Sequence, residues 1–355
     1  MASEAFAEFF RGKTILVTGG CGSIGSSLVE RLLQLEPSRV RVFDNNEGRM
    51  FELQQRLVPR YASARFLIGD IRDKLRLELA AEGADLIIHA AAYKHVPLCE
   101  YNPHEAVLTN VIGTQNVIHA ALGKGVKHTL LISTDKAVNP INTLGATKLL
   151  SERLMMNAAV GGTTSLFSCV RFGNVLNSSG SVVQVFREQI VNGDAVTVTS
   201  REMTRFIMSG GEVAALVLTA CQAMQGREVF LLKMRSLRIL DLAEVMIEEL
   251  APRAGKDPAS IRIREIGVRP GEKMHEELIS EMEARHVQDG GAMYILKSGL
   301  FLPTLVERPA ETTLLRGPLT SRDAVKLTKD EIRDLLAEVG VIEPLTPVSP
   351  PRYPA

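Results

Sequence analysis

Short hydrophobic runs alternate with amphipathic stretches through the first half of the chain. The runs with the length and composition of buried strands lie at residues 14–18, 40–43, 85–89, 128–133 and 166–172. The stretches with helical spacing lie at residues 26–35, 106–123 and 147–159. Strands that alternate with helices in this way form parallel sheets covered on both faces. The pattern therefore predicts an α/β fold with a Rossmann-type doubly wound parallel sheet.

The alternation loosens in the second half, where turns and short strand-like pieces replace it. We expect a Rossmann domain over residues 10–175, with further sheet elements at about 206–245. Residues 176–205 and 246–335 are expected to form a smaller substrate-binding lobe. The last residues, 343–355, contain five prolines, and we expect them to be poorly ordered.

The composition excludes several classes of protein. The 355 residues include 41 basic and 41 acidic side chains, so no net charge favours nucleic acid or an anionic membrane surface. The four cysteines are widely spaced, which favours free thiols in a reducing compartment over a disulfide framework or a metal site. No apolar run approaches the ~18 residues of a membrane span, and no signal peptide is recognisable. We expect a cytoplasmic protein that binds neither nucleic acid nor a membrane.

A glycine-rich turn joins the first strand to the first helix. Gly19, Gly22 and Gly25 would form a tight turn, let the backbone approach a pyrophosphate and allow close helix packing. Asp44 ends the second strand, where a carboxylate binds the ribose hydroxyls of a dinucleotide. A carboxylate there favours NAD, because it would repel the additional phosphate of NADP. Arg49 keeps NADP as an alternative, since a guanidinium could reach that phosphate.

Two further segments follow strand-like runs and bring small or polar residues to the same edge. Asp70 would accept a hydrogen bond from the adenine amine or, alternatively, cap a helix. The alanines at 90–92 leave room for the cofactor, and Lys94 and His95 would reach a phosphate or a sugar. His89, inside a strand, is expected to be a core histidine. The residues predicted to hold the cofactor are Gly19, Gly22, Ser23, Ile24, Gly25, Asp44, Asn45, Asp70, Ile71, Ala90, Ala91, Ala92 and Lys94.

Reactive groups gather at the end of the strand-like run that includes Leu131. Thr134, Asp135 and Lys136 place a hydroxyl, a carboxyl and an amine side by side where an open α/β sheet presents its ligand crevice. Lys148 adds a second amine on the next predicted helix. This cluster predicts acid/base chemistry.

Six further motifs follow the glycine-rich turn in order. They are Ala-Ala-Ala-Tyr-Lys-His-Val-Pro at 90–97, Thr-Asn-Val-Ile-Gly-Thr at 109–114, Ser-Thr-Asp-Lys-Ala at 133–137, Arg-Phe-Gly-Asn-Val at 171–175, Met-Thr-Arg-Phe at 203–206 and Arg-Pro-Gly-Glu-Lys at 269–273. Together they resemble the nucleotide-sugar 4,6-dehydratases, and more narrowly the polysaccharide-biosynthesis branch of the extended short-chain dehydrogenase/reductases that acts on UDP-N-acetylglucosamine. The resemblance covers about residues 10–335 and is to the short form without a membrane region.

The resemblance implies a reaction and a role for each residue of the cluster. Hydride leaves C4 of the sugar for the cofactor, the C5 proton and the C6 hydroxyl are lost as water, and hydride returns to C6. Asp135 would protonate O6, Lys136 would take the C5 proton, Thr134 would hydrogen-bond O4, and Lys148 would bind the nicotinamide ribose. To act as a base near neutral pH, Lys136 needs a lowered pKa, through burial or through the positive charges of the nicotinamide ring and Lys148.

One position departs from the pattern of the superfamily. The usual Tyr-x-x-x-Lys motif places a tyrosine as the C4 base, but this chain has Leu144, which transfers no proton. Some members of the branch carry methionine there. The O4 proton would then pass to Asp135 through Thr134, or to a water. The departure also sustains the alternative of a non-catalytic, NAD-binding scaffold.

The second half of the chain supplies groups that suit a nucleotide-diphosphate N-acetylhexosamine. Arginine side chains bind phosphate oxygens as planar forks. The residues expected to bind the substrate are Lys94, His95, Asn174, Ser181, Val182, Arg205, Arg269 and Glu272. UDP is the expected nucleotide and GDP the alternative, while a C4 epimerase or reductase is the runner-up activity. Related enzymes pair their subunits through helices beside the catalytic lysine, so we expect a homodimer or a larger homo-oligomer.

Overall fold

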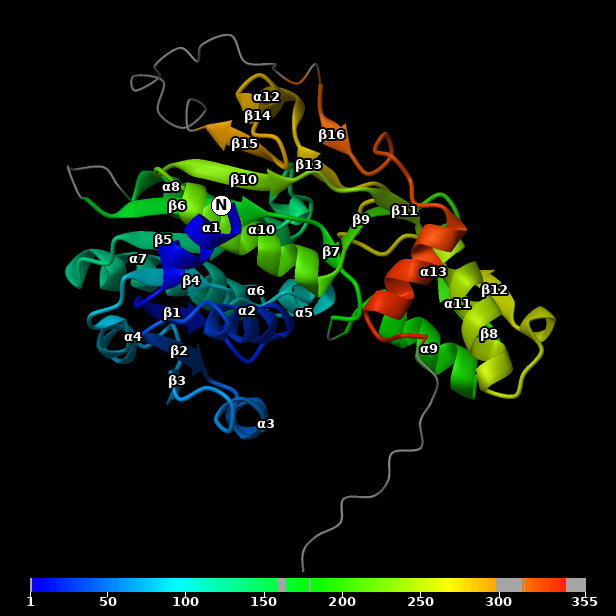
Figure 1. Cartoon of the computed structure of the whole chain (residues 1–355). Helices are drawn as coiled ribbons and strands as arrows, with labels where there is room; N and C mark the ends of the chain where they lie inside the picture. The colour runs from blue at the N-terminus through cyan, green and yellow to red at the C-terminus, as the bar shows by residue number, and fades with distance from the viewer. Residues whose placement is uncertain (1, 159–163, 179, 298–314, 316, 343–355) are drawn as a thin grey trace, which may run out of the picture.

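A nine-stranded sheet forms the centre of the computed structural model, which describes residues 2–158, 164–178, 180–297, 315 and 317–342 (Figure 1). The strand order is β14-β15-β10-β6-β5-β4-β1-β2-β3. The strands from β3 to β10 in this order are parallel, and β15 and β14 continue the sheet in antiparallel pairing. The strands are β1 (Thr14–Thr18), β2 (Arg39–Asp44), β3 (Ala64–Ile68), β4 (Leu86–His89), β5 (His128–Ile132), β6 (Leu166–Arg171), β10 (Glu228–Leu232), β14 (Val287–Asp289) and β15 (Met293–Lys297).

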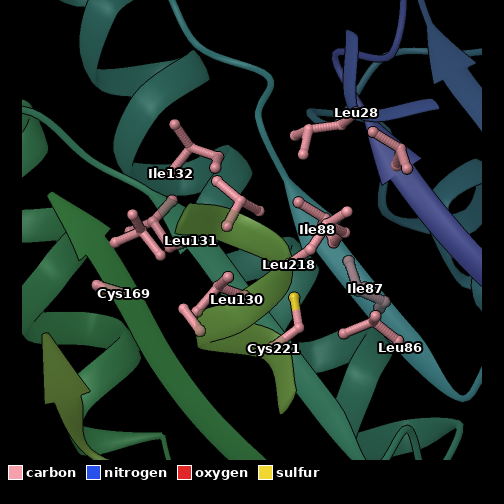
Figure 2. Packing of buried hydrophobic residues seen from close by; sticks show 14 of the residues in the cluster. Leu28, Leu86, Ile87, Ile88, Leu130, Leu131, Ile132, Cys169, Leu218 and Cys221 are labelled. Carbon is pink, nitrogen blue, oxygen red and sulfur yellow. The ribbon is translucent and has the colours of Figure 1, made fainter. Parts of the chain in front are cut away.

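Helices pack in two groups against this sheet. In one group α2 (Ser23–Leu33) contacts α10 (Gly210–Ala223), and in the other α7 (Gly113–Gly123) contacts both α4 (Lys74–Ala81) and α8 (Thr143–Asn157). Figure 2 shows Leu218 and Cys221 of α10 close to aliphatic side chains of β4 and β5. The remaining elements of this half are α1 (Ala2–Phe10), α3 (Glu47–Leu57), α5 (Val96–Tyr101), α6 (Pro103–Ala106), the π-helical turn η1 (Val107–Ile112) and the 3-10 turn η2 (Asp135–Ala137).

A smaller lobe with its own hydrophobic core lies beside the carboxyl ends of the parallel strands (Figure 1). Its helices α9 (Val182–Asn192), α11 (Ile239–Arg253) and α13 (Lys329–Glu338) pack with the two-stranded sheet of β8 (Ala195–Val198) and β12 (Arg262–Glu265). Connecting elements are β7 (Asn174–Val175), β9 (Thr204–Met208), β11 (Ser236–Arg238), η3 (Pro258–Ser260), β13 (Glu277–Ile279), α12 (Glu281–Ala284) and β16 (Leu319–Thr320).

The sheet and the connecting elements are joined through one fully buried arginine. Arg171, at the end of β6, pairs with Glu152 of α8 at 2.7 Å and with Glu283 of α12 at 3.0 Å, and donates to the backbone oxygen of Leu278 at 3.0 Å. Ser133 donates a hydrogen bond to the same Glu152 carboxylate at 2.5 Å. This network ties the residue that precedes the predicted acid/base cluster to the second half of the chain.

The structure confirms the predicted doubly wound parallel sheet and differs from the prediction in detail. Strand β3 is the strand-like run expected before Gly69. Helices α3 and α4 were not expected. In α4 the exposed Leu75 and Leu79 weaken the helical periodicity, whereas α3 has a regular buried face of Met50, Leu53 and Leu57. Strands β14 and β15 belong to the main sheet although they fall within the range predicted for the lobe, and α11 joins the lobe from residue 239. The proline-rich tail at 343–355 lies outside the described residues. In the described part of the chain, no helix is both long and apolar enough to span a bilayer.

Candidate active site

A cavity of about 160 Å³ lies at the carboxyl ends of β1, β2 and β4, where the sequence predicts the cofactor. Most of the residues predicted for that site line it, together with Phe43, Gly69, Tyr93 and Thr109, which were not predicted. The Oγ1 atom of Thr109 is buried and has no hydrogen-bond partner in the described structure. The lining residues are Gly19, Gly22, Phe43, Asp44, Asn45, Gly69, Asp70, Ile71, Ala90, Ala91, Ala92, Tyr93 and Thr109.

At Gly19 and Gly25 the glycine-rich turn leaves no space for a side chain. A Cβ on Gly25 would lie 2.1 Å from the backbone oxygen of Gly19, and a Cβ on Gly19 would lie 2.6 Å from the backbone of Ala91. Gly19 also has a φ of +66°, which L side chains rarely adopt. The turn therefore brings bare backbone to the cavity, and α2 begins directly behind it at Ser23, with its positive end toward the turn.

Backbone amides orient the Asp44 carboxylate at the end of β2. Its Oδ2 accepts from the N–H of Cys21 at 3.0 Å, and its Oδ1 accepts from the N–H of Asn46 at 2.9 Å. Each oxygen keeps a further lone pair for a ligand. The carboxylate is thus fixed beside the cavity, ready to accept hydrogen bonds from hydroxyl groups.

Asp70 lines the same cavity and is held by Arg72. The Arg72 guanidinium lies 2.7 Å from the Asp70 carboxylate, and Asn45 donates to it at 3.3 Å. Burial opposes the charge, but these hydrogen bonds outweigh it and hold the pKa of Asp70 below its ordinary value. Of the two readings for Asp70, the helix cap is wrong, since Asp73 caps α4 instead.

His89 is a fully buried core histidine, as the sequence predicts. Thr114 donates its hydroxyl hydrogen to the backbone oxygen of Asn110, so the His89 Nε2–H must donate to Thr114 Oγ1, 3.1 Å away. Nδ1 then accepts from Thr18 at 2.7 Å. Burial, with a smaller contribution from the charge of Lys148, lowers the pKa of His89 to about 3, so the imidazole stays neutral.

Thr134, Asp135 and Lys136 form a compact cluster directly after β5. The Thr134 hydroxyl donates to Asp135 Oδ1 at 2.9 Å, and Lys136 Nζ lies 3.0 Å from the same oxygen. Asp135 is fully buried, and its Oδ2 has no hydrogen-bond partner among the described residues. One carboxylate oxygen is therefore shared by the two neighbours, and the other is buried without a partner in the described structure.

Burial and nearby charges set the protonation of this pair. Burial raises the pKa of Asp135, and Lys136 offsets this only in part. Burial would lower the pKa of Lys136, but the carboxylates of Asp135 and Glu276 outweigh both burial and the charge of Arg205. The prediction of a lowered pKa for Lys136 is therefore wrong, because two carboxylates face the amine and the opposing cation is Arg205 rather than Lys148.

Lys148 lies beneath the cluster. Its Nζ donates to the backbone oxygen of Ile132 at 2.7 Å, and burial lowers its pKa to about 8. Leu144, one helical turn earlier on α8, is buried in a small hydrophobic cluster with Cys99 and Ala106. The position of the superfamily's tyrosine is thus filled by a packing residue.

A second cavity of about 160 Å³ adjoins Lys136, and Asn174 accepts a hydrogen bond from that amine at 3.3 Å. The chain from Ala90 to Pro97 passes from the wall of the first cavity to the wall of the second. The residues that line the second cavity are Val96, Pro97, Lys136, Asn142, Asn174, Arg205, Arg269, Pro270, Gly271, Glu272, Lys273 and Glu276.

Residues 271–277, which we call the docking segment, bind the loop that follows the acid/base cluster. Three hydrogen bonds of 2.7 Å join the two segments: Lys273 Nζ to Val138 O, Asn142 Nδ2 to Gly271 O, and Asn139 Nδ2 to Glu277 Oε2. The wall of the second cavity is therefore attached directly to the loop that carries Lys136.

Glu276, in the docking segment, is a site residue that the sequence reasoning missed. It is 2% exposed, and its Oε1 lies 3.4 Å from Lys136 Nζ and 3.6 Å from Arg205 Nε. Its Oε2 is buried and has no hydrogen-bond partner in the described structure. The available signal was that Glu276 directly precedes β13 and lies two positions before Leu278. Residues two apart in an extended chain lie on the same face, so Glu276 shares the inner face with the buried Leu278.

The remaining predicted residues are only partly brought together. The guanidinium of Arg205 turns toward the docking segment, with hydrogen bonds to the backbone oxygens of Thr204 at 2.8 Å and Met274 at 3.3 Å. The predicted residues outside the lining of the two cavities are Ser23, Ile24, Gly25, Lys94, His95, Thr134, Asp135, Lys148, Ser181 and Val182. Among these, Thr134 and Asp135 contact the site through Lys136, and Gly25 packs under the glycine-rich turn.

The doubly wound sheet, the glycine-rich turn and the lobe over the strand ends define the extended short-chain dehydrogenase/reductase class. A family model described as "Polysaccharide biosynthesis protein" matches residues 15–298, and the chain belongs to this family. A Methanocaldococcus jannaschii protein named "Uncharacterized membrane protein MJ1061" is 49% identical over 96% of this chain and 99% of its own length.

A further relative and a solved structure also match most of the chain. A Campylobacter jejuni protein named UDP-N-acetylglucosamine 4,6-dehydratase (inverting) is 41% identical over 76% of this chain and 78% of its own length. The X-ray structure of Pen from Bacillus thuringiensis is 40% identical and superposes with a TM-score of 0.87 over 94% of this chain and all of that one. The fold is therefore shared over nearly the whole chain with a solved relative.

Proposed function

We propose that the protein is an NAD-dependent dehydratase that converts UDP-N-acetylglucosamine to a 4-keto-6-deoxy nucleotide sugar for surface glycan biosynthesis. The observation that carries this proposal is the buried contact of Asp135 with Lys136, 3.0 Å apart and beside the second cavity. Loss of water across C5 and C6 needs a base and an acid close together, and this pair supplies both. Chemistry confined to C4, as in an epimerase, has no need of them.

The residues of the first cavity fit NAD. Bare backbone at the glycine-rich turn suits a pyrophosphate, the fixed Asp44 carboxylate suits ribose hydroxyls, and the buried Oγ1 of Thr109 has an unused hydrogen-bonding capacity. Bound NAD supplies the acceptor for hydride from C4 and its donor to C6. Asp44 supports NAD over NADP, because both of its oxygens are fixed where the additional phosphate would lie close to a negative charge.

The pair of Asp135 and Lys136 holds one proton between its two groups. Transfer of that proton from the Lys136 ammonium to the Asp135 carboxylate gives a neutral amine and a neutral acid, the forms that the elimination requires. Burial favours this transfer, since it replaces two buried charges by two neutral groups. The raised pKa of Asp135 supports its role as the acid, and the role of Lys136 as a base depends on the transfer.

Thr134 is proposed to hydrogen-bond O4. Its hydroxyl donates to Asp135 Oδ1, so its oxygen can accept a hydrogen bond from O4. Because Asp135 already holds the proton that came from Lys136, the O4 proton leaves to a water when C4 is oxidised, and a proton from solvent restores the pair at the end of the cycle. Leu144 is packed in a hydrophobic cluster and takes no part in this transfer. Lys148, whose Nζ donates to the backbone oxygen of Ile132, would bind the nicotinamide ribose.

The second cavity is proposed to bind the nucleotide diphosphate. Arg269 lines it and carries a planar fork that suits phosphate oxygens, and the buried Oε2 of Glu272 has no partner in the described residues, which suits a ribose hydroxyl. Four buried cysteines without disulfides support a reducing compartment such as the cytoplasm. The nucleotide is UDP in this proposal, and GDP is the alternative to be tested.

The test is mass spectrometry of the purified protein with UDP-N-acetylglucosamine and, separately, with GDP-N-acetylglucosamine. Loss of one water without accumulation of reduced nicotinamide is expected with UDP-N-acetylglucosamine. Unchanged mass with a new configuration at C4 would instead establish an epimerase. No change in either sugar under conditions where NAD binds would establish a non-catalytic protein.

We also propose that the chain forms a homodimer through α5 and α8. Tyr101 of α5 and Leu150 of α8 are exposed by 87% and 51%, and Leu98 of α5 by 63%. Exposed apolar side chains on neighbouring helices are typical of a protein interface. Light scattering should give twice the chain mass, and Tyr101→Lys combined with Leu150→Lys should give the monomer mass. A monomer before substitution would refute the proposal.

A further inference from the structure

Building on the proposed function, we propose that Glu276 is a further catalytic residue. Its Oε2 atom accepts a hydrogen bond from the C6 hydroxyl as that group leaves, while its Oε1 atom stays paired with Lys136 and Arg205. The proposal gives a role to a buried carboxylate that the predicted mechanism does not use.

The contact with Lys136 places Glu276 next to the reacting carbons. An amine that takes the C5 proton lies about 3–3.5 Å from C5, and Glu276 Oε1 lies 3.4 Å from that amine nitrogen. Lys136 and Glu276 line the same cavity, so the carboxylate is within reach of the substituents of C5, which are the ring oxygen, C4 with its oxygen and C6 with its hydroxyl. Once C4 is a ketone, only the C6 hydroxyl among them donates a hydrogen bond.

Glu276 is prepared to accept that hydrogen bond. Burial opposes its charge, but Lys136, Arg205 and Lys273 outweigh burial and hold the pKa of Glu276 below its ordinary value, so the group is a carboxylate. Its Oε2 is buried without a partner in the described part of the chain, and a buried acceptor without a donor is unfavourable. A hydroxyl group of the substrate would supply the missing donor.

The water that leaves in the elimination step carries two hydrogens, and each of them needs a hydrogen-bond acceptor. The C5–H bond breaks and its proton goes to Lys136 Nζ, the electron pair forms the C5–C6 double bond, and the C6–O6 bond breaks as O6 takes the proton of Asp135. The departing water carries the hydrogen from Asp135 and the hydrogen that O6 already had. Asp135, now a carboxylate, accepts a hydrogen bond from the first of these hydrogens, and Glu276 accepts a hydrogen bond from the second.

The test compares two leaving groups in one assay. UDP-N-acetylglucosamine loses water, whereas its 6-deoxy-6-fluoro analogue loses fluoride, which has no hydrogen to donate. Both substrates give the same 4-keto-6-deoxy product, so mass spectrometry follows them equally. Glu276→Gln keeps the size of the side chain but places an amide donor at one of the two oxygens. Because Glu276 also contacts Lys136, any effect through that amine acts on both substrates alike. We therefore expect this variant to slow the hydroxyl substrate at least about tenfold more than the fluoro analogue.

A surface carboxylate nearby in the chain provides the matched control. Glu281 is exposed at the start of α12 and has no described contact with Lys136 or Arg205, so Glu281→Gln should match the unmodified enzyme on both substrates. Glu276→Asp is a second variant that keeps the charge and shortens its reach, and it should show the same difference between the two substrates. Thermal unfolding of each variant checks that it is folded.

The outcomes separate the two proposals. Equal slowing of Glu276→Gln on both substrates would mean that Glu276 acts through Lys136 or the fold, and would overturn the inference. Unchanged rates on both substrates would overturn it as well. If the unmodified enzyme releases neither water nor fluoride, the proposed function fails and takes the inference with it.

Discussion

Replacement of Arg171 by methionine should destabilise the protein strongly. Arg171 is fully buried and holds the carboxylates of Glu152 and Glu283 at 2.7 and 3.0 Å. Arg171→Met keeps much of the side-chain volume but leaves two carboxylates buried near each other without their cation. It also removes the donor to the backbone oxygen of Leu278.

The expected loss of stability is about 3–5 kcal/mol, the usual cost of removing one partner from a buried ion pair. The loss should shrink as the pH falls. Arg171 holds the pKa of Glu283 below its ordinary value, although burial opposes this. In the native protein, the stability that the Glu283 carboxylate contributes is therefore lost as the pH falls through its folded pKa. In the variant, burial raises the folded pKa instead, and uptake of a proton then stabilises the folded state at low pH.

Chemical denaturation at pH 7.5 and pH 5.5 measures both effects. Arg56→Met is the matched control, because Arg56 pairs with Glu30 on the surface and its side chain is 57% exposed; it should change stability by less than about 0.5 kcal/mol. Replacing Arg171, Glu152 and Glu283 together by apolar residues should recover most of the loss. A loss below about 1 kcal/mol for Arg171→Met, or no recovery in the triple variant, would refute the reasoning.

Three further predictions concern the site. Gly25→Ala should abolish NAD binding measured by calorimetry, because the new Cβ would lie 2.1 Å from a backbone oxygen, whereas Gly123→Ala, with open space around its Cβ, should leave binding intact. Lys136→Met should slow water loss by about 10²–10⁴-fold, and turnover that survives this change would contradict the mechanism. Lys148 has a pKa of about 8 in the folded protein and a higher one when unfolded, so the unmodified protein should gain stability relative to Lys148→Met between pH 8 and pH 10. A constant difference in the free energy of unfolding would disprove this.

The local pattern of hydrophobic and polar residues was sufficient to predict those parts of the fold that depend on residues close together in the sequence. Runs such as 14–18 and 128–133 are buried on both faces, and their continuous hydrophobicity predicts strands of a parallel sheet. The glycine-rich turn and Asp44 were also predictable, because their chemistry lies within one strand-turn-helix-strand unit. Helix α4 was missed because its exposed Leu75 and Leu79 reduce the contrast between its apolar and polar faces.

The protonation of the site was not predictable, because it depends on residues far apart in the chain. Lys136 and Glu276 are 140 positions apart, and only the folded docking segment brings them to 3.4 Å. Sequence reasoning placed Lys148 as the charge that acts on Lys136, since it is close in the chain. Three-dimensional packing puts Arg205 and Glu276 in that place and raises the pKa of Lys136 instead of lowering it.

The docking segment has a consequence for how a turnover proceeds. Hinge closure would have to break its hydrogen bonds with the loop that carries Lys136 and separate Arg171 from Glu283 in the interior. We therefore expect both cavities to be formed before the substrate binds, so that the sugar enters a preformed site and the two lobes do not close around it. A rigid frame would suit the proposed reaction, in which hydride leaves C4 and returns to C6 of the same bound sugar.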